Sequence, residues 1–171
     1  PEEVKKEAVK AIEQGFNRYT ITKGMPGLCE KILGKARNEN GIKAEDIMIT
    51  SGVAGALTLA FLVLINPGDE VLVPDPYFVS FKHLVNLCGG KIKFVDTYPD
   101  FKITPERISP HISPRTKILI INSPSNPTGV VCKPQHLKEI CEFAEKHNLI
   151  IISDEIYKDF IYEIEYQSIG K

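Results

Sequence analysis

Asn126 stands in a setting that suits the binding of a small ligand. It lies in residues 123–129, a run that holds two prolines, ends at Gly129 and directly follows the apolar segment 117–122. The prolines fix φ at two points of the loop, and the glycine permits a tight exit. Open α/β sheets bind ligands at the carboxyl ends of their strands, where this loop would hold the amide. An ordinary turn is the alternative, because Asn, Pro and Gly are common turn residues.

Asp154 is a second candidate for chemistry, because it follows the apolar run 149–152 and Ser153. A carboxylate at the end of a buried strand can hold a cation or a protonated ring nitrogen. A helix N-cap is one alternative, and the acidic residue of a P-loop nucleotide hydrolase is another. The hydrolase class needs G-x-x-x-x-G-K-[ST], which does not occur in the sequence. The G-x-S-x-G motif of serine hydrolases does not occur either.

A third candidate is the run Ser-Gly-Val-Ala-Gly at residues 51–55, which precedes an apolar helical segment. Small residues allow close approach to the backbone. The N–H groups of Gly52, Val53 and Ala54 would point outward with the helix dipole behind them, which is the physics of an anion site. A helix start that needs glycine only for close packing is the alternative.

These three loops each follow a predicted strand, at residues 47–50, 117–122 and 149–152. In a parallel sheet the carboxyl ends of the strands lie along one edge. We therefore expect the glycine loop, Asn126 and Asp154 to face a single ligand.

The elements that position these loops alternate along the chain. Apolar spacing predicts helices near residues 4–14, 27–38, 54–65, 77–87 and 137–144, with a short one beginning at Pro105. Further strands are expected at residues 70–73 and 91–95. Strands interleaved with amphipathic helices predict an α/β fold, a mostly parallel sheet with helices on both faces in three layers. No linker divides the sequence into two domains.

Composition excludes several classes of function. The 171 residues are 43% hydrophobic, with a net charge of -1, 21 basic and 22 acidic residues. No basic face favours nucleic acid, and the longest apolar run, 54–65, is too short to cross a bilayer. We expect no metal site, because the histidines lack ligand spacing. Scattered cysteines favour a reducing, cytoplasmic location; they are Cys29, Cys88, Cys132 and Cys141.

Four motifs together resemble the class I/II aminotransferases, pyridoxal-phosphate enzymes of fold type I similar to aspartate aminotransferase. They read Ser-Gly-Val-Ala at residues 51–54, Pro-Asp-Pro-Tyr-Phe at 74–78, Asn-Pro-Thr-Gly at 126–129 and Asp-Glu-Ile-Tyr at 154–157. Their order and intervals match, and the resemblance covers essentially the whole chain. The third and fourth motifs are specific as a pair, whereas the glycine loop is not.

The resemblance implies a role for each residue of the site. Backbone amides of the Gly52 loop, those of Val53 and Ala54, would hold the phosphate of pyridoxal 5'-phosphate. Phe78 would stack on the pyridine ring, with the adjacent Tyr77 as the alternative.

Asn126 and Tyr157 would donate to the phenolic oxygen of the ring, and the Asn126–Pro127 bond would be cis. Asp154 would pair with the ring nitrogen and keep it protonated, so that the ring can act as an electron sink. Tyr19 would reach the phosphate of the neighbouring subunit's cofactor, which implies a homodimer with shared sites.

The sequence also departs from the family pattern. In the family a lysine that forms the internal Schiff base follows the aspartate by a few dozen residues, and neither Lys158 nor Lys171 stands in that context. We expect residues 1–171 to be an incomplete cofactor-binding large domain, without the N-terminal arm, the small domain or a catalytic residue.

The parent enzyme would move an amino group between an L-amino acid and a 2-oxo acid, and this fragment would be inactive. Two alternatives stay open. The parent could be a pyridoxal-phosphate lyase, acting on C–S bonds or forming an aminocyclopropane. The chain could instead be a naturally short, non-catalytic protein that binds the cofactor or a partner.

Overall fold

The computed structural model describes residues 1–38 and 41–171. In this part of the chain four strands form one parallel sheet, in the order β2-β1-β3-β4. The strands are β1 (Glu70–Asp75), β2 (Lys91–Asp96), β3 (Thr116–Asn122) and β4 (Ile150–Asp154). The helices are α1 (Glu2–Glu13), α2 (Pro26–Asn38), α3 (Gly52–Leu64), α4 (Ser80–Leu87), α5 (Pro105–Ile108) and α6 (Pro134–Lys146), with a 3₁₀ turn at Ser109–His111.

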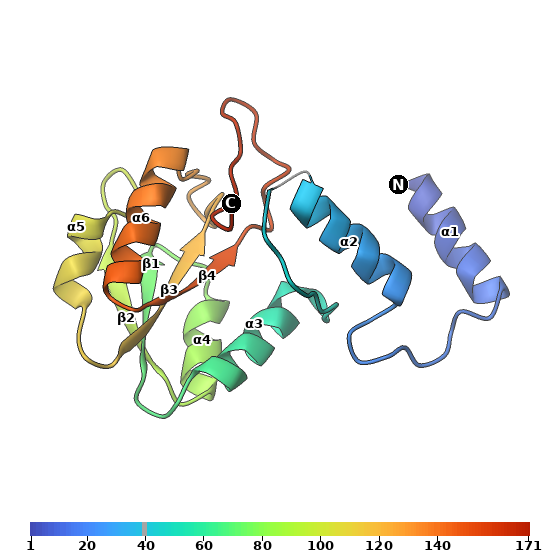
Figure 1. Ribbon diagram of the computed structural model, residues 1–171, viewed down its shortest axis with the longest axis horizontal. Helices are drawn as coiled ribbons and strands as arrows, with labels where there is room; N and C mark the ends of the chain where they lie inside the picture. The colour runs from blue at the N-terminus through green and yellow to red at the C-terminus, as the bar shows by residue number, and fades with distance from the viewer. Residues whose placement is uncertain (39–40) are drawn as a thin grey trace.

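Helices cover both faces of the sheet, as predicted. Figure 1 shows α3 and α4 on one side of the strands and α5 and α6 on the other. Side chains alternate between the two layers because successive residues of a strand point to opposite faces. In β1, Val71 and Val73 pack with α3 and α4, whereas Leu72 packs on the opposite face with Ile108 and Ile140. The three-layer α/β architecture is therefore confirmed.

The predicted strand at residues 47–50 is wrong. This segment has no strand structure in the described part of the chain. Its backbone pairs elsewhere, because the Ile49 N–H donates to the carbonyl oxygen of Lys23 at 2.9 Å. The Ile49 amide is thus satisfied by the segment before α2, outside the sheet.

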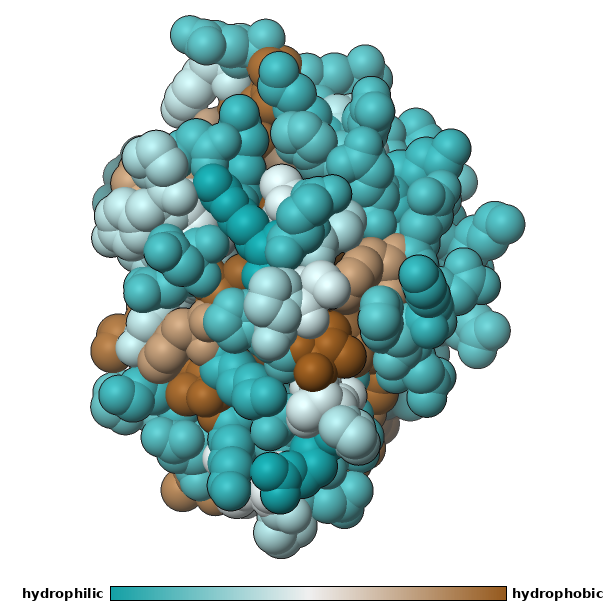
Figure 2. All heavy atoms as spheres, turned by 90° about the vertical axis from the view of Figure 1, so that its left-hand side faces the viewer, coloured by the Kyte–Doolittle hydropathy of each residue, from teal (hydrophilic) through white to brown (hydrophobic). Residues whose placement is uncertain are grey.

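The two N-terminal helices lie away from the sheet. Neither α1 nor α2 contains a buried residue, and Figure 1 shows both beside the sheet layers. Large apolar side chains are exposed here, at Val4, Ile12 and Phe16, and also on α3 at Val63. The face that carries α5 is different, because Figure 2 shows it as mostly hydrophilic, with apolar side chains in small separate groups. No helix among the described residues has both the length and the apolar character that crossing a membrane requires.

A buried carboxylate closes the end of the sheet opposite the predicted site. Glu70, at the start of β1, is 4% exposed. It accepts hydrogen bonds from Lys93 Nζ at 2.8 Å, Ser113 Oγ at 2.5 Å and Thr116 Oγ1 at 3.1 Å. Burial alone would raise the pKa of Glu70, but these three donors outweigh it and lower the pKa to about 2. The network joins β1 to β2 and to the start of β3.

Because the pKa of folded Glu70 is lowered, its contribution to stability is complete above the unfolded value of 4.5 and is lost as the pH falls through about 2. We expect Glu70→Gln to lower the free energy of unfolding by about 2 kcal/mol at neutral pH, because the charge-assisted bonds weaken. The difference from the unsubstituted protein should vanish in strong acid. Urea titrations across the pH range measure both effects. Glu145→Gln, at an exposed position on α6, serves as the control, and an equal loss in both variants would contradict the prediction.

Candidate functional site

A cavity of about 270 Å³ lies at the carboxyl edge of the sheet. It brings together all of the predicted site residues except Tyr19. Its walls are formed by Gly52, Val53, Ala54, Phe78, Asn122, Asn126, Asp154, Ile156 and Tyr157. The three loops converge as expected, although the segment before the glycine loop is not a strand.

The glycine loop is built for its backbone conformation rather than for close packing. Gly52 has φ +67°, in the left-handed region that glycine adopts without strain. A Cβ at this position would meet nothing within 4 Å, which argues against the packing alternative. The hydroxyl of Thr50 donates to the Gly52 carbonyl at 2.9 Å and fixes the turn. The amides of Val53 and Ala54 lie in the first turn of α3 and have no intrahelical acceptor, and both residues line the cavity.

Asn122 is a site residue that sequence reasoning missed. Its side chain ties two of the loops together, because Oδ1 accepts from the Asn126 N–H at 2.7 Å and Nδ2 donates to the Asp154 carbonyl at 3.0 Å. As the last residue of an apolar run, it reads only as the end of a strand. A polar side chain at the carboxyl end of a central strand was the available signal.

The Asn126 loop is closed by its own backbone. The Gly129 N–H donates to the Ser125 carbonyl at 2.7 Å, and the Ser125 N–H donates to Val130 at 3.0 Å. The Asn126–Pro127 bond is cis, as the resemblance implied.

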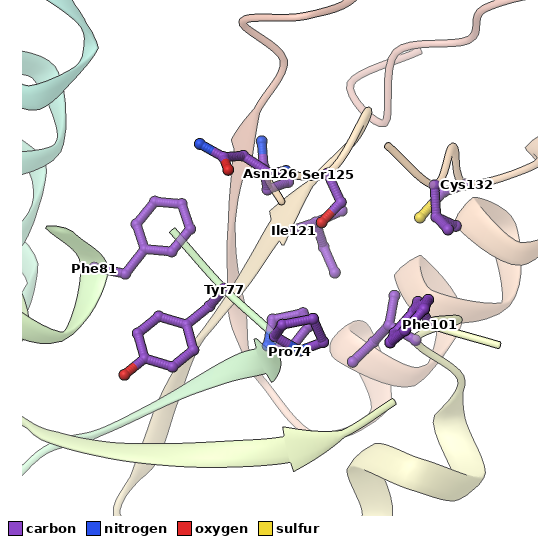
Figure 3. Close-up of a pocket in the computed structure, with 12 residues that line it drawn as sticks. Pro74, Tyr77, Phe81, Phe101, Ile121, Ser125, Asn126 and Cys132 are labelled. Carbon is purple, nitrogen blue, oxygen red and sulfur yellow. The ribbon is translucent and has the colours of Figure 1, made fainter. Parts of the chain in front are cut away.

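Apolar side chains surround a small hollow behind this loop. In Figure 3, Asn126 and Ser125 lie at one end of it, with Phe81 and Tyr77 on one side and Cys132 on the other. The hollow measures about 30 Å³, far too little for a cofactor. The residues that line this hollow therefore pack behind Asn126, and the hollow is not a second binding site.

The structure distinguishes the two adjacent aromatic residues. Tyr77 stacks on Phe94 of β2, with ring centroids 4.7 Å apart, and packs against the core. Phe78 lines the cavity and meets Phe81 edge-on, with centroids 5.8 Å apart. Of these two residues, Phe78 is thus the one available to a ligand at this site.

Asp154 gives the cavity its charge. Its residue is only 7% exposed, and Oδ1 accepts one hydrogen bond, from the Ile156 N–H at 3.2 Å. Within residues 1–38 and 41–171 no ion pair involves this carboxylate. Burial raises the pKa of Asp154, and the negative charge of Glu155 raises it further. A cation placed in the cavity would reverse that shift, so the site favours a positively charged group.

The remaining predicted residues lie at the rim of the cavity or outside it. Tyr157 lines the cavity with its side chain partly exposed. Tyr19 is fully exposed in the N-terminal segment and does not reach this cavity, so its role toward a neighbouring subunit stays a prediction. Among the described residues no lysine lines the cavity.

The chain belongs to the class I and II aminotransferases. The family profile described as aminotransferase class I and II matches residues 1–169. The aspartate/prephenate aminotransferase of Thermus thermophilus is 41% identical over the whole chain.

Solved structures agree with this assignment. Aspartate aminotransferase from Thermus thermophilus with maleate superposes with a TM-score of 0.96 at 41% identity, over 99% of this chain. Aromatic aminotransferase from Pyrococcus horikoshii superposes with a TM-score of 0.97 at 38% identity, also over 99%. The chain covers 46% and 47% of these two structures. It spans about half the length of the relatives it matches, 46% for the curated Thermus thermophilus protein.

Asp154 should cost the ligand-free protein stability. Its raised pKa means that the folded state disfavours the charged form, so the cost is present above the raised pKa and disappears below the ordinary value of 3.8. We expect Asp154→Asn to raise the melting temperature by a few degrees at neutral pH, and to have no effect near pH 3. Scanning calorimetry measures this. Asp159→Asn, at an exposed position, is the control; a lower melting temperature for Asp154→Asn at neutral pH would contradict the prediction.

Proposed function

We propose that residues 1–171 supply part of the cofactor-binding domain of an enzyme that moves an amino group between an L-amino acid and a 2-oxo acid, with pyridoxal 5'-phosphate as cofactor. The observation that carries this proposal is the buried Asp154 carboxylate, which shares one cavity with a helix N-terminus and an aromatic ring. Family membership supports it as well, because the matched relatives are named as aminotransferases.

The described residues fit the chemical parts of such a cofactor. The amides of Val53 and Ala54, at the start of α3, would hold its phosphate, because helix N-termini favour anions. Phe78 would lie against the ring, and the side chains of Asn126 and Tyr157 would donate to the phenolic oxygen.

Asp154 would hold a proton on the ring nitrogen. The bound cofactor supplies an electron sink for the pair left when the α-proton of the amino acid departs. A carboxylate buried beside the ring nitrogen keeps that nitrogen positive, because the ion pair is screened weakly away from water. The pair also relieves the unfavourable burial of Asp154 itself. The proposal assigns no catalytic lysine within residues 1–171.

We further propose a homodimer in which Tyr19 contacts the neighbouring subunit's cofactor. The N-terminal segment supports this, because it exposes Tyr19 together with apolar side chains at Val4, Ile12 and Phe16. Exposed apolar groups of this kind mark interaction surfaces. A cytoplasmic location, and the absence of nucleic-acid and membrane partners, stay predictions from composition.

We expect the 171-residue protein to bind pyridoxamine 5'-phosphate, an amine form of the cofactor that cannot attach to surface lysines. Asp154→Ala should weaken this binding by at least about tenfold, because a charge-assisted contact of about 1.5–3 kcal/mol is lost. Asp159→Ala is the matched control. Fluorescence titration gives the affinities, and equal affinities for all three proteins would sink the assignment of the site.

The longer enzyme that contains this sequence should transfer amino groups only when a 2-oxo acid is supplied. Asp154→Ala in that enzyme should lower turnover by at least about 10²-fold, in line with the loss of a preorganised electrostatic contact. Release of ammonia or of a thiol from the amino acid without any 2-oxo acid would favour the lyase alternative instead.

A further inference from the structure

Glu155 carries a hydrogen-bond network that the proposed cofactor site does not use. Within the described residues its carboxylate accepts four hydrogen bonds. Oε1 accepts from Ser153 Oγ at 2.9 Å, Ser168 Oγ at 2.8 Å and the Ile169 N–H at 3.3 Å. Oε2 accepts from the hydroxyl of Tyr166. Because every donor but Ser153 comes from residues 166–169, Glu155 fastens that segment to the end of β4.

This network lies on the side of the sheet away from the cavity. Ile152 packs against the core on the α3 and α4 side of the sheet, whereas Ile151 packs on the α5 and α6 side, where Ile169 also packs. Asp154 lines the cavity, and its neighbour Glu155 is turned to the segment that carries Ile169. Glu155 follows the last residue of β4 directly, so its contacts fix the backbone next to Asp154 on the side of the sheet where Ile169 packs.

We infer that Glu155, together with Tyr166 and Ser168, forms a clasp that positions the Asp154 carboxylate in the cavity. The inference rests on the proposed function, because it names what holds the group that would meet the ring nitrogen. Glu155 is a positioning residue in this account, since it contacts neither the cavity nor a ligand.

The clasp has the properties that positioning requires. Its donors come from residues 11 to 14 positions further along the chain, so it fixes the strand end against a separate segment. Burial raises the pKa of Tyr166, and the hydrogen bond and charge of Glu155 raise it further. Tyr166 therefore stays protonated and remains a donor throughout the physiological pH range. Ser168 is itself buried, so water does not compete for its bond.

Without the clasp, the unfavourable burial of the Asp154 carboxylate would favour its rotation toward solvent. Its carboxylate is buried with one accepted hydrogen bond and a like charge on the next residue. Rotation toward water would relieve that cost. Fixing the backbone at Glu155 holds the Cα–Cβ bond of Asp154 toward the cavity, so that the carboxylate stays where a cation would meet it.

The test compares pyridoxamine 5'-phosphate with its 1-deaza analogue, in which carbon replaces the ring nitrogen. The dissociation constant of the 1-deaza analogue divided by that of pyridoxamine 5'-phosphate reports the contact between Asp154 and the ring nitrogen, because every other contact is shared. We expect the ratio to fall about tenfold in Tyr166→Phe/Ser168→Ala, which removes two donors and keeps the Glu155 charge. Ser168→Thr, in a protein that keeps Tyr166, retains a hydroxyl at residue 168. This variant should keep most of the ratio of the unsubstituted protein. Tyr162→Phe, the same change at an exposed tyrosine four residues before Tyr166, should leave the ratio unchanged.

A second measurement needs no cofactor. The Ile156 N–H donates to Asp154 Oδ1, so its hydrogen exchange should accelerate about tenfold in Tyr166→Phe/Ser168→Ala if the carboxylate turns away. In Tyr162→Phe it should stay as in the unsubstituted protein. Should the double variant fail to fold, Tyr166→Phe alone gives both readouts.

The two proposals fail in different ways. A ratio near one, or no binding, in the unsubstituted protein removes the assigned role of Asp154, and the exchange rate of Ile156 then decides the clasp alone. A large ratio that the double variant leaves unchanged, with unchanged exchange at Ile156, overturns the clasp and leaves the cofactor site standing. A double variant that binds pyridoxamine 5'-phosphate and its 1-deaza analogue equally more weakly would show that residues 166–169 only stabilise the fold. That result also overturns the clasp.

Discussion

A carboxylate buried without a cation beside it is the constraint on which the rest of this structure depends. Asp154 lies at the end of β4, nearly inaccessible to water, with a single hydrogen bond to its side chain. Such a group opposes folding unless something positive is brought to it. The surrounding loops supply the N-terminus of α3 and an aromatic face, which are the features on which the proposed cofactor site rests.

The parallel sheet explains why these groups meet. Strands β3 and β4 run side by side, so Asn122 and Asp154 are register partners at the same edge. The Asn122 amide then binds the backbone of both loops and sets their separation. On the other side of β4 the Glu155 clasp fixes the same strand end. Hydrogen bonds from the Asn122 and Glu155 side chains thus join the segments that form the cavity.

The sequence alone predicted those site residues that have an unusual side chain or turn directly after an apolar run. Asn126, Asp154 and the Gly52 turn were recognisable because unusual residues follow apolar runs. The strand prediction at residues 47–50 was wrong because apolar spacing does not show whether a neighbouring strand is available for pairing.

The sequence pattern alone left Tyr77 open beside Phe78, since neighbouring aromatics in a turn carry no period, and the structure places Phe78 in the cavity. Asn122 and Glu155 act through hydrogen bonds to residues distant in the chain, and no local pattern specifies such contacts.

The polar network at Glu70 and the binding cavity occupy opposite ends of the same strands. Because the Glu70 network stabilises the sheet at one end, the loops at the other end contribute little to the stability of the fold. Residues around the cavity can therefore change while the sheet keeps its shape.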